Sequence, residues 1–384
     1  MSTYSSPWVD DEIAAVGEMA RDFFLREVVA HLDRFADQHA VDRRTWVEAG
    51  KQGLLCVSVP EEHGGGGGTF AHEAMILWQQ GRVGDDALPL AIHSTIVAHY
   101  VANYGTEEQK QRWLPRLASG DLVGAIAMTE PSAGSDLKMI RTTARLEGSD
   151  ETGEYVLDGA KTFITNGSQA GLILVVARTS GPGARGLSLV AVEGDDVAGL
   201  TRGRPLDKIG QRGQDTRELS FEGVRVPANH LIGGEGEGFA MLMQQLPQER
   251  LAIAIGAVAQ AEYAVELAVA HAKERSAFGG TLWDLQNTRF VLAACATDVL
   301  AARTFLDHCI VEHTAGRLDA ATASMSKLHA TELLSSVADR CLQVFGGYGY
   351  IFEYPIARIF AGARLQRLYG GASEVMKEVV ARAM

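Results

Sequence analysis

Cysteine is scarce in this sequence: four are present among 384 residues, and none belongs to a C-x-x-C pair. That spacing is typical of thiol redox motifs and of many zinc sites, so we expect reduced, mostly buried thiols and no metal site. Basic residues are also few, because 35 Lys and Arg face 48 Asp and Glu and leave a formal net charge of -13. Phosphate backbones are bound by clustered Lys and Arg. We therefore do not expect nucleic acid as a partner.

Long apolar runs are missing as well. No uninterrupted run of about 18 apolar residues occurs, which is the length expected of a transmembrane helix. The N-terminal stretch 1–24 is polar and acidic, without the apolar centre of a secretory signal. We expect no membrane span and a cytoplasmic protein. What the chain does contain is 46% apolar and 22% charged residues, the composition of a globular protein long enough for two or three domains.

Residues 1–121 are predicted to be helical. In "GTEEQKQRWL", Thr106 precedes Gln109 by three positions, which is the pattern of a capping box at a helix start. The stretch "FAHEAMILWQQGRV" (70–83) has apolar residues at helical spacing. Both patterns indicate amphipathic helices packed on a core.

Residues 122–235 are predicted to form a β-domain. "EYVLDGAKTFITN" places Asp158 and Gly159 between two short β-prone runs, a pattern that predicts a hairpin turn. "LILVVART", "LSLVAVEG" and "ELSFEGVRV" are further predicted strands. Short strands with glycine-rich turns, and no alternating helices, favour a sandwich or barrel over a parallel Rossmann sheet.

Residues 236–384 are predicted to be helical again. The expected helices cover 249–275, 282–313, 321–345 and 374–384. Long helices joined by short turns are typical of a bundle. These helices are apolar over most of their circumference, so they need covering on several sides. We therefore expect an oligomer.

Four short motifs lie at predicted strand and helix ends. "AMTEPSAGSD" (127–136) has small and hydroxyl residues that let a backbone approach a flat ligand, while the threonines of "KTFITNG" (161–167) would more often be structural. "FGGYGY" (345–350) follows a helix, unlike the dinucleotide fingerprint, although its N–H groups could cradle phosphate. "RSAFG" (275–279) offers an arginine suited to pyrophosphate and equally to a helix C-terminus. Each signal is weak alone.

In combination they are specific. In this order and spacing, "TEPSAGSD", "FITNG", "RSAFG", "QVFGGYGY" and "YGGASE" resemble the acyl-CoA dehydrogenase family over essentially the whole chain. The resemblance implies an α+β fold with an N-terminal helical domain (1–121), a middle β-barrel (122–235) and a C-terminal four-helix bundle (236–384), with FAD held between them. It also implies a homotetramer, built as a pair of dimers, in which one subunit contributes to its neighbour's FAD site.

The resemblance carries cofactor contacts onto individual positions. Thr129 and Ser135 would lie near the flavin ring and the ligand phosphates, and Thr165 would hydrogen-bond the flavin N5 edge. Phe163 stands where many relatives have tryptophan, so an aromatic face remains without the indole N–H. The full set of implied FAD contacts is Met128, Thr129, Ser135, Phe163, Ile164, Thr165, Arg275, Phe278, Gln286, Gln343, Val344, Phe345, Gly346, Gly347, Ala372, Ser373 and Glu374.

Two further groups follow from the resemblance. Arg275, Gln286 and the loop 343–347 would grip the adenine diphosphate part of FAD across the dimer, and the segment 372–374 would touch the same cofactor. The implied substrate contacts are Ser135, Phe239, Ala240, Arg250, Gly370 and Gly371. Ala240 stands where an aromatic residue is common, which indicates a wider acyl pocket.

The usual catalytic base of the family is absent. Most members have a glutamate where this chain has Gly370, between Tyr369 and Gly371. The long-chain and isovaleryl branches carry it instead on the first helix of the C-terminal domain, and "LPQER", "YGGASEVMKEVVAR" and "AIHSTIVAHY" look closest to the long-chain branch. Glu249 is therefore the candidate base, although a Glu-Arg pair on a helix is more often solvent-exposed. Pro247 is expected to kink or open the helix there.

The resemblance implies α,β-dehydrogenation of a fatty acyl-CoA. Glu249 would take the α-proton, the Gly370 N–H would polarise the thioester carbonyl, and the β-hydride would move to flavin N5. The product would be a trans-2-enoyl-CoA, and the electrons would leave to an electron-transferring flavoprotein. The alternatives are an acyl-CoA oxidase, which usually carries an extra C-terminal domain, a flavin monooxygenase, or a catalytically inactive acyl-CoA-binding protein. Acyl chain length, branching and pathway stay open.

Overall fold

The computed structural model describes residues 4–149 and 152–384. Its first part is helical, as expected. The segments are α1 (Asp11–Phe23), η1 (Phe24–Val28), η2 (Val29–His31), α2 (Leu32–Gln38), α3 (Arg43–Lys51), η3 (Glu61–His63), α4 (Phe70–Arg82), η4 (Ala91–Val97), α5 (Ala98–Tyr104) and α6 (Glu107–Ala118). Of these, η1 and η4 are π-helical.

The capping box at the start of α6 is confirmed. The Thr106 hydroxyl accepts a hydrogen bond from the Gln109 N–H at 3.3 Å, and the Gln109 side-chain oxygen accepts one from the Thr106 N–H at 2.9 Å. These bonds satisfy backbone donors that would otherwise have no partner at a helix start. The helix expected in 70–83 is α4.

The middle part is one eight-stranded sheet. Its strands are β1 (Gly124–Ala127), β2 (Thr143–Glu147), β3 (Glu154–Thr165), β4 (Leu172–Arg178), β5 (Leu187–Glu193), β6 (Leu200–Arg202), β7 (Thr216–Pro227) and β8 (Leu231–Ile232), with helical turns η5 (Leu137–Met139), η6 (Ala184–Gly186) and η7 (Ala228–His230). The hydrogen-bonded order is β6-β7-β3-β2-β4-β5-β8, and β1 pairs with β4 in parallel. The sheet curls round its own apolar core, so that β5 also contacts β7.

The hairpin predicted at Asp158 and Gly159 is wrong. Both residues lie inside β3, which pairs with β7 along its length and has a register shift between Leu157 and Gly159. Gly159 has φ 149°, and a Cβ there would lie 2.5 Å from the Thr142 hydroxyl. Glycine therefore permits a bulge with close backbone approach, a role that local sequence does not distinguish from a turn.

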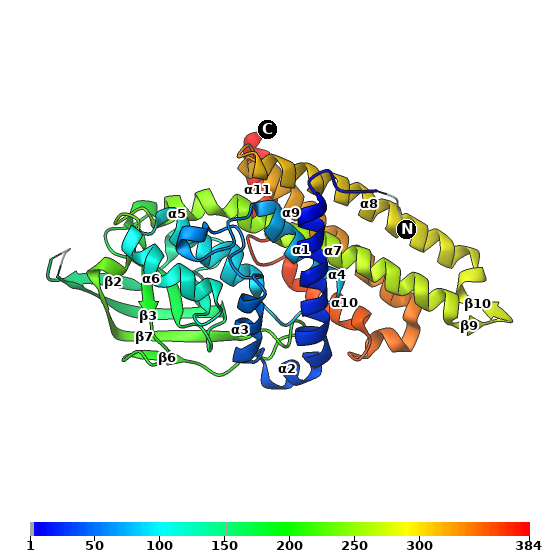
Figure 1. Ribbon diagram of the computed structural model, residues 1–384, viewed down its shortest axis with the longest axis horizontal. Coiled ribbons are helices and arrows are strands. Elements are labelled where there is room, and N and C mark those ends of the chain that lie inside the picture. Colours follow the sequence, from blue (N-terminus) through cyan, green and yellow to red (C-terminus); the bar gives the residue numbers. More distant parts are fainter. Residues whose placement is uncertain (1–3, 150–151) are drawn as a thin grey trace.

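The last part is helical. Its elements are α7 (Gly238–Glu274), β9 (Ser276–Ala277), β10 (Gly280–Thr281), η8 (Leu282–Asp284), α8 (Gln286–Thr314), α9 (Ala320–Phe345), η9 (Gly346–Tyr350), α10 (Pro355–Gln366) and α11 (Ser373–Ala383). The four expected helices are present, and α10 is an additional one that packs on α7 and α9. In Figure 1, α7 runs from the sheet to the β9–β10 hairpin at the opposite end of the molecule.

By length and composition, α7 alone among the described helices could cross a membrane, with a mean hydropathy of 1.4 over its most apolar 18 residues. However, 56% of that window is buried inside the protein. A buried helix of this kind is also what a central bundle helix requires.

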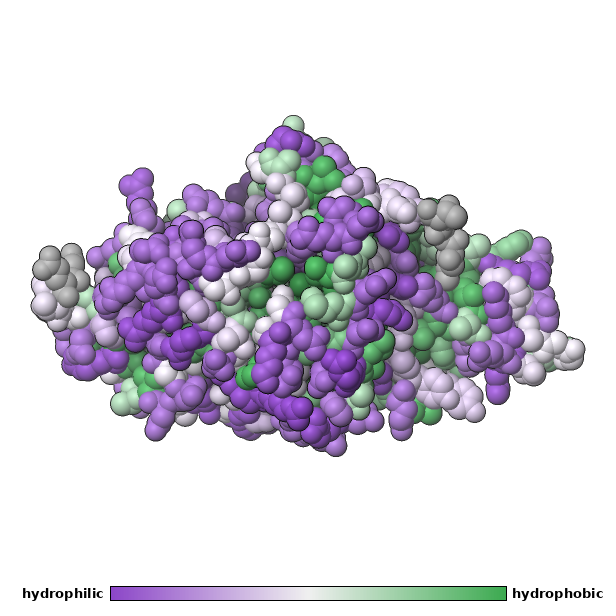
Figure 2. Space-filling view, in the orientation of Figure 1, coloured by the Kyte–Doolittle hydropathy of each residue, from purple (hydrophilic) through white to green (hydrophobic). Residues whose placement is uncertain are grey.

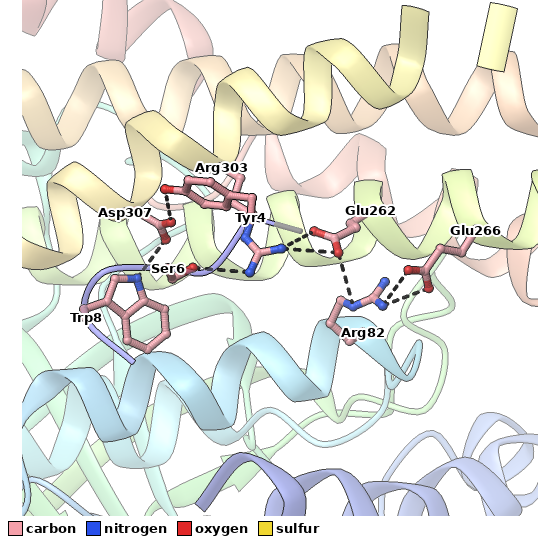
Figure 3. A network of polar contacts seen from close by, with 8 residues as sticks. All are labelled: Tyr4, Ser6, Trp8, Arg82, Glu262, Glu266, Arg303 and Asp307. Atoms are coloured by element: carbon pink, nitrogen blue, oxygen red, sulfur yellow. Dashed lines mark hydrogen bonds and ion pairs between the residues drawn. The ribbon is translucent and has the colours of Figure 1, made fainter. Parts of the chain in front are cut away.

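The N-terminal segment is bound to the helical bundle through Asp307 of α8 (Figure 3). The Tyr4 hydroxyl donates to Asp307 Oδ2 at 2.8 Å, and the Trp8 indole N–H donates to Asp307 Oδ1 at 2.7 Å. Asp307 is 2% exposed. Residues about three hundred positions apart in the chain are thus held together by charge-assisted hydrogen bonds.

A second set of charges continues this contact along α7 (Figure 3). Glu262 lies between Arg303, at 3.2 Å, and Arg82, at 4.0 Å. Arg82 also pairs with Glu266 at 2.8 Å. The Arg303 guanidinium stacks 4.8 Å from the Trp78 ring. The network connects α4, α7 and α8.

We expect Glu262→Gln to destabilise the protein by about 1.5–3 kcal/mol, because two half-buried guanidinium groups lose a charged partner. The matched control is Glu378→Gln, whose partner Arg382 is 78% exposed; exposed pairs contribute about 0–1 kcal/mol. Chemical denaturation of the FAD-saturated protein measures both. Equal midpoints for the two variants would show that this network is energetically unimportant.

Candidate active site

Glu249 and Arg250 lie on α7, where α4, η4, α8 and α9 pack against this helix. They are 5% and 6% exposed, so the interpretation as an exposed surface pair is wrong. The helix is continuous through Pro247 and does not open there. Proline removes one backbone donor, and packing on several sides holds the helix together despite that loss.

The Glu249 carboxylate is held by Tyr100 of α5, whose hydroxyl donates to Oε1 at 2.9 Å. Burial raises the pKa of Glu249 to about 7, while the Tyr100 hydrogen bond and the Arg250 charge oppose that rise. Within the described part of the chain, Oε2 accepts no hydrogen bond. A buried carboxylate with a raised pKa and one free oxygen is suited to accept a proton near neutral pH.

Gly370 lies in the loop between α10 and α11, against the same face of α7. Its φ is 63°, and a Cβ at this position would lie 2.3 Å from Cδ1 of Ile253. Ile253 follows Glu249 by four residues, one helical turn, so both side chains are on one face of α7. The loop that, by the resemblance, would more often carry the base thus meets the helix one turn from Glu249, and Ile253 Cδ1 occupies the space that a side chain at position 370 would need.

In this loop, one backbone N–H group is free to bind a ligand, while the neighbouring carbonyl is fixed by a hydrogen bond. Among the described residues, the Gly370 N–H donates to no protein acceptor. The next carbonyl, that of Gly371, accepts a hydrogen bond from the Lys327 ammonium at 2.8 Å. Lys327 is fully buried, and burial, together with nearby Arg250 and Arg367, lowers its pKa to about 8. The loop is therefore anchored to α9 while one donor stays free.

Arg250 lies beside the carboxylate and points its guanidinium toward α9. Its Nη1 donates to the Ser324 hydroxyl at 3.1 Å, and its buried Nε has no hydrogen-bond partner among the described residues. The arginine predicted to contact substrate is therefore partly committed within the protein, with Nε unpaired.

The surroundings of Ser373 and of the glycines after α9 show whether this part of the protein suits FAD. The Ser373 hydroxyl is buried at the first residue of α11 and lacks a partner among the described residues. Gly346 and Gly347 have open space where a Cβ would stand. An unpaired hydroxyl at a helix N-terminus and an uncovered glycine backbone both suit a phosphorylated cofactor. Ala372 and the exposed Glu374 flank Ser373.

The sheet brings two of the predicted motifs together. The Thr129 carbonyl accepts from the Thr162 N–H at 2.9 Å, and the Met128 carbonyl accepts from the Lys161 ammonium at 3.0 Å. This places the loop 127–136, which includes the exposed Ser135, beside the end of β3, where Thr165 lies half-buried.

Phe163, on the same strand, is 66% exposed with φ 60° and lies within the second register shift of β3, between Lys161 and Ile164. Its ring is free to cover a flat ligand. By contrast, the Ile164 side chain is buried in the sheet core, so only its backbone is available to a cofactor.

The remaining predicted FAD contacts gather elsewhere, around the β9–β10 hairpin. Arg275 ends α7 with its guanidinium 5.6 Å from the Tyr348 ring, and Phe278 is 93% exposed. Gln286 and Gln343 are exposed on α8 and α9, and Val344 is partly buried. The Phe345 ring is buried against His271, with centroids 4.2 Å apart, so its side chain does not face a ligand. Figure 1 shows this hairpin at the end of the molecule opposite the sheet.

Phe239 and Ala240 lie at the start of α7. The Lys138 ammonium stands 5.6 Å from the Phe239 ring, and Ala240 is exposed. Glu249 comes nine positions after Ala240, about 14 Å along a helix, so the structure does not bring Ala240 to the carboxylate. Figure 2 shows apolar residues in a hollow near the middle of one face.

Comparisons with known proteins agree with this architecture. Family models for the N-terminal, middle and C-terminal domains of acyl-CoA dehydrogenase match residues 10–121, 125–224 and 236–384. The chain is 45% identical to the long-chain specific acyl-CoA dehydrogenase of Mus musculus mitochondria, over 95% of this chain and 84% of that protein. The chain belongs to the acyl-CoA dehydrogenase family.

Solved structures extend the likeness. An acyl-CoA dehydrogenase from Geobacillus kaustophilus has 41% identity and a TM-score of 0.95, with 99% of both chains covered. A glutaryl-CoA dehydrogenase from Mycobacterium smegmatis, solved with FADH2, has 25% identity and a TM-score of 0.91, covering 98% of this chain and 95% of that one. A chain described as electron transferring flavoprotein of Acidaminococcus fermentans has 33% identity and a TM-score of 0.93, covering 100% and 99%.

This acyl-CoA dehydrogenase is thus an FAD-dependent oxidoreductase. Three residues of its candidate site escaped sequence reasoning: Tyr100, Ile253 and Lys327. Tyr100 and Lys327 are polar residues within helical runs, where a buried position and an exposed one cannot be told apart by spacing alone. Ile253 is one apolar residue among many on α7, and only its contact with Gly370 distinguishes it.

Proposed function

We propose that this chain catalyses α,β-dehydrogenation of a long-chain or branched fatty acyl-CoA to the trans-2-enoyl-CoA, with an electron-transferring flavoprotein as acceptor. The observation that carries the proposal is the buried Glu249 carboxylate, one helical turn from the contact between Ile253 and Gly370. A glutamate at position 249, or at position 370 once Ile253 no longer fills that space, would then serve the same substrate carbon.

In this proposal, Glu249 removes the α-proton through the unhydrogen-bonded Oε2, and the Gly370 N–H donates to the thioester carbonyl as enolate charge develops. A fixed donor of this kind is worth about 3–4 kcal/mol in comparable oxyanion sites. Burial excludes water from the carboxylate and keeps it basic. FAD, when bound, supplies the acceptor for the hydride from the β-carbon.

We further propose the domain limits 1–121, 122–235 and 236–384, a cytoplasmic location, and a homotetramer built as a dimer of dimers. Arg275, Phe278 and Gln286 lie in or beside the β9–β10 hairpin. The separation of this hairpin from the sheet supports an FAD site shared between subunits (Figure 1). One FAD molecule would meet the sheet of one subunit and the β9–β10 hairpin of its neighbour.

Arg275→Ala is expected to lower FAD retention and to loosen the oligomer, because a charge-assisted contact across subunits contributes about 1.5–3 kcal/mol. Flavin content and elution volume after gel filtration measure both effects. Arg382→Ala, which removes an exposed arginine from α11, is the control. Full FAD occupancy in an unaltered oligomer would remove Arg275 from the cofactor site.

The test of the proposed function is anaerobic reduction of the flavin by a panel of saturated acyl-CoAs that includes long and branched chains. We expect rapid bleaching with at least one member, and transfer of the electrons to an electron-transferring flavoprotein. A yellow protein that no acyl-CoA bleaches would instead be an acyl-CoA binder. Peroxide release as fast as turnover with an artificial acceptor would indicate an oxidase.

A further inference from the structure

Tyr100 occupies a place for which the catalytic scheme above has no role. Its side chain is fully buried, and its hydroxyl makes the hydrogen bond to Glu249 Oε1 across 149 positions of sequence. Tyr104, one turn further along α5, points its hydroxyl to the Gln244 side chain at 2.9 Å. The two tyrosines are chemically equal neighbours, and only Tyr100 contacts the carboxylate.

The backbone before Tyr100 is unusual. η4 is π-helical, and the Ala98 N–H donates to the His93 carbonyl five residues earlier. One extra residue in a helical turn rotates all later side chains by about 100° relative to an uninterrupted α-helix. Such insertions are frequent at functional sites. The wide turn therefore determines which face of α5 meets α7, and with it the direction of the Tyr100 hydroxyl.

We propose that Tyr100 is a positioning residue for catalysis, resting on the proposed role of Glu249 as base: its hydroxyl fixes Oε1 and thereby directs Oε2 to the substrate and maintains the charged carboxylate. Burial and the neighbouring Glu249 charge raise the pKa of Tyr100 well above its usual value, so the hydroxyl stays a donor whenever the base is ionised. Among the described residues, the other ionisable groups near the carboxylate are Arg250 on α7 and Tyr104 on α5.

The test measures the protonation of Glu249 directly in the FAD-loaded protein. Infrared titration of the carboxylic acid carbonyl band, assigned as the band that Glu249→Gln removes, gives the midpoint in each variant. A hydrogen bond to the carboxylate stabilises its charged form, so Tyr100→Phe should raise the midpoint by about one to two pH units. Tyr104→Phe should leave the midpoint unchanged. An unchanged midpoint in Tyr100→Phe overturns the proposal.

A second substitution keeps the packing of the ring and should shift the Glu249 midpoint in the opposite direction. 3-Fluorotyrosine placed at position 100 is a stronger donor and should lower the same midpoint; no decrease would contradict the proposal even where Tyr100→Phe fails to fold. The kinetics of flavin reduction should show the same change. In Tyr100→Phe, the pH profile of kcat should move to higher pH, while KM stays unchanged. If none of the acyl-CoAs reduces the flavin of the parent protein, the proposed function fails. The infrared titration still decides the role of Tyr100 in that case.

Discussion

Glu249→Gln is expected to slow reduction of the flavin by a saturated acyl-CoA by about 10²–10⁴-fold, the range for loss of a general base. Glutamine keeps the size of the side chain and can still accept the Tyr100 hydrogen bond, but it cannot accept the α-proton. FAD content and acyl-CoA binding should be retained, so KM should change little while the reduction rate falls. Anaerobic stopped-flow absorbance of the flavin measures this rate.

Glu266→Gln supplies the control, because Glu266 lies on the same helix, pairs with Arg82 and is 39% exposed. It should reduce its flavin like the parent. In the parent, the rate should rise with pH through about 7, because the buried Glu249 must lose its proton before it can act. If Glu249→Gln bleaches as fast as the parent, the base lies elsewhere and the proposed function of this glutamate is wrong.

The second large effect is recovery of activity by a base placed on the loop. Gly370→Glu in the Glu249→Gln background should remain inactive, because the new Cβ would stand 2.3 Å from Ile253 Cδ1 and φ is 63°. Adding Ile253→Ala removes that atom, and we expect the triple variant to regain part of the lost rate. Recovery should be partial, because a left-handed backbone is strained for glutamate and a buried carboxylate carries a desolvation cost.

Two comparisons make this result interpretable. Glu249→Gln with Ile253→Ala alone should stay slow, which separates restored chemistry from a merely enlarged pocket. Replacing Gly370 by Gln instead of Glu in the triple variant supplies the same bulk without a base. If the glutamate and glutamine versions reduce the flavin equally slowly while both bind FAD, the two positions do not serve one carbon.

The sequence predicted local structure correctly where the interactions that form it join residues close together in the chain. Thr106 and Gln109 identify the start of α6 because a capping box is made by residues three positions apart. Gly159 misled because glycine suits both a turn and a bulge, and the choice depends on Thr142, which lies opposite it in the folded sheet. The helix α10 was missed because its short amphipathic stretch follows the glycine-rich η9 and has no strong start signal besides Pro355.

The order and spacing of the motifs in the sequence by themselves determined the family, the three-part architecture, FAD and the absence of the usual glutamate at Gly370. Only the tertiary structure decided that Glu249 is buried, that Tyr100 is its hydrogen-bond donor and that Ile253 fills the space beside Gly370. The physical reason is that burial, pKa and close contact depend on α5, α7 and the loop before α11. The residues that meet there, Tyr100, Glu249 and Gly370, lie more than one hundred positions apart in the chain, and no periodicity within any one segment records how it meets the others.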